Sequence, residues 1–298
     1  MTDFSAKRFL IVDGHAGMRS SLRIILSSFG VVYAEMAASA NDVVRRLQTK
    51  SYDVILCDYF LGEGSDGQQL LEQLRHGRLI GLQTVFVMIT AERSYERVVS
   101  AVELAPDDYL IKPFTAETLR LRLERVFEKK AAFAPIHELI EAQRIGEAIS
   151  VCSRAVAAGG RYTVDLLRLL AELHVTQGEF AQAEQIYQRV LEMRAIPWAR
   201  MGLARMLHLQ GKSGEAEVLL ESVVEDAPEY MAAHDLLAAV YAANGKSGQA
   251  QAVLARALAA SPYTLHRQRQ MGEIALCNDD LETAERAFSA VVERGRTS

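Results

Sequence analysis

The sequence predicts an α/β domain with a doubly wound, five-stranded parallel sheet, followed by an all-α solenoid of helical repeats. In the first 130 residues, short apolar runs alternate five times with segments of helical periodicity, which is typical of a parallel sheet covered by helices. After residue 130 the strand signals vanish, and small residues recur every 33 or 34 positions. We therefore divide the 298 residues into two domains, 1–130 and 131–298.

Composition narrows the class of protein. With 50% hydrophobic and 24% charged residues, the chain has a globular composition. Its net charge of -5 provides no basic excess for binding nucleic acid, and its apolar runs are too short to span a bilayer. The scattered Cys57, Cys152 and Cys277 argue against a disulfide framework and against a zinc site. We expect a cytoplasmic protein without a nucleic-acid or membrane partner.

The strands of the first domain are expected where apolar runs are short and bounded by turn residues. The run at 85–89 is the most emphatic, and 52–58 is a buried run that stops on a carboxylate. The expected strands are 9–12, 31–35, 52–58, 85–89 and 109–111.

The helices between them follow from apolar spacing and capping residues. Leu22, Ile25, Leu26 and Phe29 recur at intervals of three and four, and Gly30 ends that helix. The expected helices are 18–29, 40–47 with Ser39 or Asn41 as cap, 68–75, 94–104, and 115–127 with Thr115 as cap.

Four polar residues directly follow the expected strands: Asp13, Asp58, Thr90 and Lys112. In an open α/β sheet, ligands bind beyond the carboxyl ends of the strands, so these side chains should meet. Two carboxylates suit Mg²⁺, and a hydroxyl with an ammonium group can take phosphoryl oxygens.

Residues 8–129 resemble the receiver domain of bacterial response regulators, through the segments IVDG, VILCDY, VMITAE and DYLIKPF in that order. The resemblance implies a flavodoxin-like strand order and a cis Lys112–Pro113 bond. It also implies a phosphoacceptor, Asp58, that is served by a histidine kinase or a phosphotransfer protein. The other roles that it implies are Mg²⁺ bound by Asp13, Asp58 and the backbone carbonyl of Phe60, a switch pair Thr90 and Tyr109, and phosphoryl binding by Lys112.

The chain departs from the family at Gly14, where a second acid is usual and commonly binds the metal. One carboxylate fewer should weaken Mg²⁺ binding, and His15 or Asp66 could compensate in part. A receiver that keeps the fold but no longer transfers phosphate is the alternative. Phe60 and Glu92 lie where the family tunes hydrolysis of the acyl phosphate, and a bulky Phe60 would exclude water. Cys57 beside Asp58 is expected to be a buried core thiol.

The second domain shows four aligned series of residues. They are Gly178, Gly211 and Gly245; Ala183, Ala216, Ala250 and Ala284; Ala171, Ala204, Ala238 and Gly272; and Tyr187, Leu220, Leu254 and Phe288. Small residues let paired helices approach, large ones fill the gap, and glycine turns the chain. The pattern resembles the tetratricopeptide repeat, with GEFAQAEQIYQRVL as the clearest instance. We expect four full repeats, starting near 164, 197, 231 and 265, a partial one at 144–157, and a short joint at 131–135.

Such solenoids usually bind a protein or peptide on the concave face that the first helices of the repeats line. The corresponding positions here are Asp165, Arg168, Glu172, Trp198, Met201, Arg205, Asp235, His266, Arg269 and Glu273. The arginines could catch acidic groups and Trp198 could be an apolar anchor, although a solvated face of mixed charge gives the same pattern. The histidines fall at different repeat phases, so no metal site is expected.

These features predict a two-component response regulator in which phosphorylation of Asp58 gates a protein contact through the repeats, or through receiver dimerisation. The alternative is a phosphorylation-independent adaptor with a degenerate receiver. An enzyme with its own substrate is disfavoured, because the repeat half shows no nucleophile and base pair.

Overall fold

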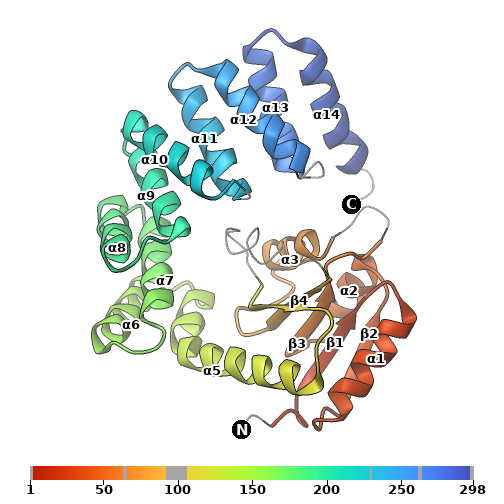
Figure 1. Cartoon of the computed structure of the whole chain (residues 1–298). Coiled ribbons are helices and arrows are strands. Elements are labelled where there is room, and N and C mark those ends of the chain that lie inside the picture. Colours follow the sequence, from red (N-terminus) through yellow and green to blue (C-terminus); the bar gives the residue numbers. More distant parts are fainter. Residues whose placement is uncertain (1–2, 63–65, 92–105, 229, 261–263, 296–298) are drawn as a thin grey trace. The chain divides into compact units, whose positions relative to one another are not determined.

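The computed structural model describes residues 3–62, 66–91, 106–228, 230–260 and 264–295, so the helix expected at 94–104 lies outside the described residues. The chain divides into two compact units (Figure 1). The described residues up to Arg154 belong to the first unit and those from Ala155 onward to the second. None of the described helices is long and apolar enough to cross a membrane.

The first unit is built on a five-stranded parallel sheet, as predicted. The strand order is β2-β1-β3-β4-β5, which is the flavodoxin-like order. The strands are β1 (Arg8–Val12), β2 (Tyr33–Ala37), β3 (Val54–Asp58), β4 (Val85–Thr90) and β5 (Asp108–Ile111). Strand β2 begins two residues later than expected, because the Val31 backbone N–H still bonds to the carbonyl of Leu26 in the turn after the first helix.

Helices cover both faces of this sheet. They are α1 (Ala16–Ser27), α2 (Ala40–Leu47), α3 (Gly67–His76) and α5 (Ala116–Glu141), with Ser39 and Thr115 as N-caps. Alternate strand residues serve opposite cores. Phe9 and Ile11 pack with α1 and α5, whereas Leu10 and Val12 pack with α2 and α3. Residues buried on both faces explain why the strands are continuous apolar runs.

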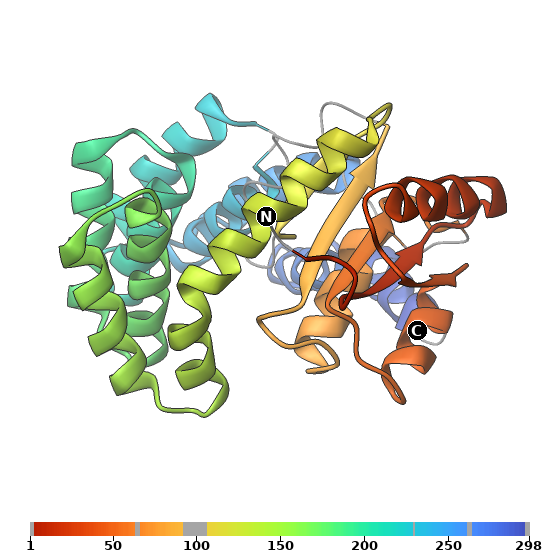
Figure 2. The ribbon, with the colours of Figure 1, turned by 90° about the horizontal axis from the view of Figure 1, so that it is seen from below.

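Helix α5 is much longer than the sequence suggested. The end predicted at residue 127 is wrong, and the expected joint at 131–135 is helical, with Pro135 inside the helix. Figure 2 shows α5 as one continuous helix, in yellow and yellow-green. Pro135 lies on the exposed side of α5, while Lys130, Phe133 and Ile136 continue the buried stripe. The helix therefore continues because its apolar face continues, in spite of the proline.

The second half of the chain consists of paired helices. The four predicted full repeats are the pairs α7/α8, α9/α10, α11/α12 and α13/α14, and α6 precedes them. Their bounds are α6 (Ile145–Ala158), α7 (Thr163–Thr176), α8 (Phe180–Met193), α9 (Pro197–Leu209), α10 (Ser213–Asp226), α11 (Met231–Ala243), α12 (Ser247–Ala260), α13 (Leu265–Cys277) and α14 (Leu281–Gly295).

The turn inside each repeat has a fixed form. Gly178, Gly211 and Gly245 have positive φ, and Asp279 takes the same conformation in the last repeat. At each turn a backbone N–H bonds to the carbonyl five residues earlier, for example Glu179 to His174 and Lys212 to Leu207.

The same turn also joins α5 to α6. Gln143 has a positive φ of 59°, and the Arg144 N–H bonds to the carbonyl of Leu139, 35 residues before the equivalent bond to His174. The expected partial repeat therefore has a first helix after all, and that helix is the last part of α5. The sequence did not reveal this helix because Gln143 stands where three of the four later turns have glycine.

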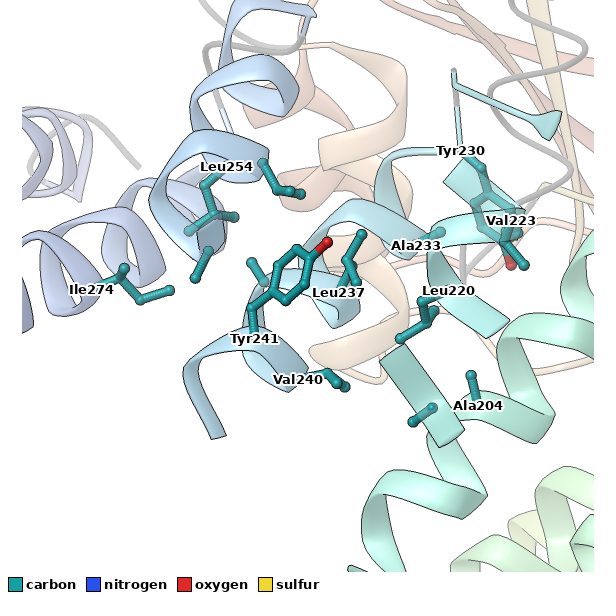
Figure 3. Packing of buried hydrophobic residues seen from close by; sticks show 14 of the residues in the cluster. Ala204, Leu220, Val223, Tyr230, Ala233, Leu237, Val240, Tyr241, Leu254 and Ile274 are labelled. Carbon is teal, nitrogen blue, oxygen red and sulfur yellow. The ribbon is translucent and has the colours of Figure 1, made fainter. Parts of the chain in front are cut away.

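Small and large side chains alternate in the repeats as the series predicted. Ala183, Ala216 and Ala250 are fully buried, and a side chain on Gly272 would overlap the ring of Phe288. Figure 3 shows part of the resulting core, where residues from successive helices such as Leu220 and Leu237 pack together.

Gly202 on α9 is a position where packing forbids a side chain, because a Cβ there would overlap the ring of Tyr187. We expect Gly202→Ala to lower the free energy of unfolding by about 1–3 kcal/mol. Gly214 on α10 is the matched control, since nothing lies within 4 Å of its Cβ direction. Gly214→Ala should leave stability unchanged or raise it by less than about 1 kcal/mol.

Urea denaturation followed by Trp198 fluorescence checks this prediction, because Trp198 lies edge-on to Tyr187 with ring centroids 6.3 Å apart. Equal midpoints for the two variants would show that Tyr187 can move aside at no cost.

Candidate functional site

The four polar residues predicted at the strand ends do lie at one edge of the sheet. Asp58 and Thr90 end β3 and β4, Asp13 follows β1, and Lys112 follows β5. These four strands are consecutive neighbours in the sheet, so their carboxyl ends lie along the same edge. Three of them, β1, β3 and β4, are labelled in Figure 1. Parallel pairing therefore gathers residues that are up to 99 positions apart in the sequence.

Lys112 connects the two carboxylates. Its Nζ lies 3.2 Å from Oδ2 of Asp58 and 3.5 Å from Oδ2 of Asp13. The Asp13 side chain is 1% exposed and that of Asp58 is 13% exposed. Two neighbouring carboxylates removed from water repel each other, and the ammonium group offsets that repulsion.

The loop after β1 orients Asp13. Its Oδ1 accepts a hydrogen bond from the backbone N–H of His15 at 2.8 Å, and its backbone carbonyl accepts one from the guanidinium of Arg19 at 2.6 Å. The sequence did not predict this contact of Arg19, since a lone arginine on an amphipathic helix carries no signal of it.

Burial raises the pKa of Asp58, and the negative charge of Asp13 raises it further, while Lys112 opposes both. The neighbouring Cys57 thiol is fully buried, and burial raises its pKa well above the usual range. Its Sγ donates to the backbone carbonyl of Asp58 at 3.2 Å. Cys57 is therefore a core thiol, as expected, and not a nucleophile.

The structure shows how much space surrounds Gly14 and where Asp66 and His15, the two residues that could compensate for the missing acid, lie. A Cβ on Gly14 would have only the Leu61 carbonyl within 4 Å, at 3.6 Å, so the position has room for a side chain. Asp66 is occupied as the N-cap of α3, where Oδ1 accepts the Gln69 N–H at 2.8 Å. The exposed His15 lies beside Asp13, with Nδ1 3.6 Å from Oδ1 of that carboxylate.

The donor set suits a hard cation but is sparse. Among the described residues, no group of three His, Cys, Asp or Glu side chains is arranged to hold a metal ion. Asp13 and Asp58 supply carboxylate oxygens, so Mg²⁺ fits their chemistry with one carboxylate fewer than the family usually provides.

The two expected switch residues occupy adjacent strands. Thr90 is fully buried, and the Tyr109 ring packs against the core on the α2/α3 face of the sheet. Burial raises the pKa of Tyr109 far above its usual range, and its hydroxyl lacks a hydrogen-bond partner among the residues that the structure describes.

Phe60 lies two residues after Asp58, beyond the end of β3. The residue is 58% exposed, and its ring stacks edge-on against Tyr59, with centroids 5.0 Å apart. Its backbone forms an isolated antiparallel bridge with Asp66. Glu92 lies outside the described residues. The Lys112–Pro113 peptide bond is cis, as predicted.

Gly67 is a site residue that sequence analysis passed over. A Cβ there would lie 2.6 Å from the Met88 sulfur and 2.7 Å from the Asp58 carbonyl, so only glycine lets α3 begin this close to β3. The GxxxDG spacing after Asp58 was the available signal.

The predicted groove residues lie on first helices of the repeats. On α7, Arg168 pairs with Glu172 at 3.1 Å, and its guanidinium stacks over Trp198 of α9 with 5.3 Å to the ring centroid. Met201 packs against the repeat core, and Arg269 pairs with Glu273 at 2.9 Å on the exposed face of α13.

Asp235 behaves differently from the expectation of an open groove acid. Its two oxygens are held by Arg267 at 2.6 and 2.8 Å, and Arg267 is 3% exposed. This bidentate pair fastens α11 to α13, so Asp235 is neutralised within the repeats. A buried arginine has no signature in a single sequence.

Comparisons with known proteins agree with this geometry. The family model for the response regulator receiver domain matches residues 9–124, and tetratricopeptide repeat models match residues 166–197 and 197–222. The chemotaxis protein CheY-3 of Vibrio cholerae is 30% identical over 122 residues, which are 41% of this chain and 92% of that protein. The chemotaxis protein CheY of Pseudomonas aeruginosa is 27% identical over 122 residues, 41% of this chain and 97% of that protein.

The repeat half has a structural neighbour. MamA from Desulfovibrio magneticus RS-1 matches with a TM-score of 0.50 and 20% identity, over 57% of this chain and 96% of the solved chain. This likeness shows the repeat fold alone. Through residues 9–124 the chain belongs to the response regulator receiver family, and it joins that receiver to a set of tetratricopeptide repeats.

Proposed function

We propose that this protein is a phosphorylation-gated response regulator whose output is a protein contact made by the repeats. Asp58 accepts a phosphoryl group from a histidine kinase or a phosphotransfer protein. The observation that supports this most directly is the Lys112 ammonium group, 3.2 Å from Asp58 and 3.5 Å from Asp13 at the carboxyl edge of the sheet.

The reaction is a transfer of one phosphoryl group between side chains. A carboxylate oxygen of Asp58 attacks phosphorus, the bond from phosphorus to the imidazole nitrogen of the donor histidine breaks, and the imidazole leaves as a neutral ring after taking up a proton. The contact of the Lys112 ammonium with the Asp58 carboxylate supports a role for Lys112 in binding the phosphoryl oxygens.

Mg²⁺ is the cofactor that this proposal requires, and it supplies positive charge to the phosphoryl oxygens. Asp13, Asp58 and the backbone carbonyl of Phe60 would hold it. Because position 14 carries no acid, and because Lys112 already contacts both carboxylates, we expect Mg²⁺ to bind weakly.

Thr90 and Tyr109 would transmit the effect of phosphorylation at Asp58 to the neighbouring strand β5. Charge on Asp58 attracts the Thr90 hydroxyl, which frees space along the neighbouring strand for the Tyr109 ring. The Tyr109 hydroxyl has no hydrogen-bond partner among the described residues, so the ring can move without breaking a hydrogen bond of that hydroxyl to them.

The repeats would bind a protein segment that combines acidic and apolar groups. Arg168 and Trp198 form a cation–π pair between successive repeats, which presents a charged and an aromatic surface together.

A phosphorylation-independent adaptor is the second candidate, and Gly14 is the observation that favours it. In that case Lys112, Asp13 and Asp58 form a closed ion cluster that stabilises a docking domain.

Labelling by acetyl phosphate separates the two candidates. We expect the wild-type chain to gain the mass of one phosphoryl group in the presence of Mg²⁺, and Asp58→Asn to gain none, with intact-mass spectrometry as the measurement. No adduct on the wild type over a wide Mg²⁺ range would favour the adaptor.

Gly14→Asp should tighten Mg²⁺ binding, because the position has room and a second acid adds charge to the site. We expect the dissociation constant to fall roughly tenfold in a calorimetric titration. Gly14→Asn matches the shape without the charge and should resemble the wild type. If Asp and Asn act alike, charge at this position does not limit metal binding.

Phe60→Asn should shorten the lifetime of phosphorylated Asp58 by about tenfold, because an amide can position the attacking water that an exposed aromatic ring excludes. Phe60→Leu keeps the position apolar and should retain most of the wild-type lifetime. The check is the decay of the phosphorylated mass after the phosphodonor is removed; identical decay in all three proteins would contradict the role of Phe60.

A further inference from the structure

The C-terminal part of α5, residues 129–141, is bound to the receiver rather than projecting freely; we call it the arm. It contacts the turn between α3 and β4 at three levels. Lys130 Nζ donates to the Leu82 carbonyl at 2.5 Å, and Glu141 Oε1 accepts the Leu82 N–H at 2.7 Å. Between them, Nδ1 of His137 lies 3.1 Å from the side-chain amide nitrogen of Gln83.

The arm also joins a charge cluster that is largely shielded from solvent. Lys130 Nζ lies 2.6 Å from Oδ1 of Asp107, and the guanidinium of Arg75 lies 3.8 Å from Oδ2 of the same carboxylate. The three side chains are 10%, 20% and 14% exposed, for Lys130, Asp107 and Arg75 respectively. Arg75 also donates to the backbone carbonyl of Gly81, in the turn that the arm contacts.

The pKa shifts of Lys130, Arg75 and His137 follow from their burial and from the neighbouring charges. Burial lowers the pKa of Lys130 and that of Arg75, and Asp107 opposes the shift in both. Burial, with the charge of Lys130, lowers the pKa of His137 to about 4. His137 is therefore neutral at neutral pH, and its Nδ1 can accept a hydrogen bond from Gln83.

Asp107 connects this cluster to strand β5, which carries Tyr109. It directly precedes β5, its N–H bonds to the Phe86 carbonyl at 2.8 Å, and its Oδ2 accepts the Phe86 N–H at 2.8 Å. Lys112 follows the other end of β5. The four-residue strand β5 thus joins two ion clusters, one with Asp13 and Asp58 and one with Lys130 and Arg75.

We propose that β5 couples the phosphorylation pocket to the arm: a change in the contacts of Lys112 shifts β5, and Asp107 transmits that shift to α5 through Lys130. The trigger rests on the proposed function, whereas the coupling itself depends only on these contacts. Because the arm ends in the first repeat turn at Gln143, the receiver controls the first helix of the repeats directly.

The physical reason is that ion pairs with little exposure hold both ends of the short strand β5, so a shift at one end strains the contacts at the other. Removing one partner of a buried pair leaves an uncompensated charge, so both clusters favour moving as units over breaking. Packed interfaces of this kind switch between discrete arrangements.

Hydrogen exchange of the full-length chain, read by mass spectrometry on peptides from residues 129–141, tests the proposal. Lys130→Met keeps most of the side-chain volume and removes the charge. We expect it to speed exchange in the arm on the order of tenfold or more. Lys129→Met is the matched control on the exposed neighbour. It removes the contact of the Lys129 ammonium with the Phe133 ring, 5.8 Å from the ring centroid, and should change exchange far less than Lys130→Met. Glu141→Gln, at the other end of the arm and away from the core cluster, should speed exchange of the last turn without affecting folding.

The coupling is tested by perturbing the pocket. Acetyl phosphate with Mg²⁺ should change exchange in the arm of the wild type and of Lys129→Met, and that change should be lost in Lys130→Met and in Asp58→Asn. Lys112→Ala perturbs the same end of β5 without phosphorylation and should also change exchange in the arm.

These outcomes separate the two proposals. If the wild type takes no phosphoryl group, the proposed function fails, while Lys112→Ala still tests the coupling. Unchanged exchange in the arm of Lys112→Ala, or equal exchange in Lys130→Met and Lys129→Met, would overturn the coupling.

Discussion

The receiver depends on one electrostatic constraint: two carboxylates, Asp13 and Asp58, are held almost out of water at the same edge of a sheet. Desolvation and mutual repulsion both oppose that arrangement, and burial accordingly raises the pKa of Asp58. The ammonium group of Lys112 contacts both carboxylates and offsets their mutual repulsion. The surrounding structure serves the same arrangement, since Gly67 lets α3 approach β3, and the loop at His15 and Arg19 fixes Asp13. A phosphoryl group on Asp58 would add negative charge to this cluster.

The second constraint is the continuity of α5. This one helix covers a face of the receiver sheet at Leu119 and Leu123, binds the α3–β4 turn at Lys130 and Glu141, and ends in the turn of a tetratricopeptide-like helix pair. A flexible linker would let two domains respond independently. A shared helix with buried ion pairs removes that freedom, so the receiver and the start of the repeats form one compact unit up to Arg154.

The repeats follow a simpler rule, in which helix separation is set by residue size. Buried alanines such as Ala216 and Ala250 bring paired helices together, and Tyr187 and Phe288 fill space that Gly202 and Gly272 leave open. The periodic positions explain the architecture and leave the other helix faces free to vary. Arg168 and Trp198 show how such variable positions meet across successive repeats to form a surface that no single repeat contains.

The sequence by itself determined the elements and the residues that follow them. Apolar runs, caps and period located the five strands, the repeat pairs and the strand-end residues Asp13, Asp58, Thr90 and Lys112, because these signals are local or strictly periodic. The tertiary structure alone decided the length of α5, the pairing of Lys130 with Asp107 and of Arg267 with Asp235, and the capping role of Asp66. A buried ion pair joins residues that are distant in the chain, so it leaves no periodic pattern in the sequence. The sequence also does not distinguish a proline on the exposed side of a continuous helix from a proline that ends a helix. Such features depend on which surfaces meet, and only the folded chain brings those surfaces together.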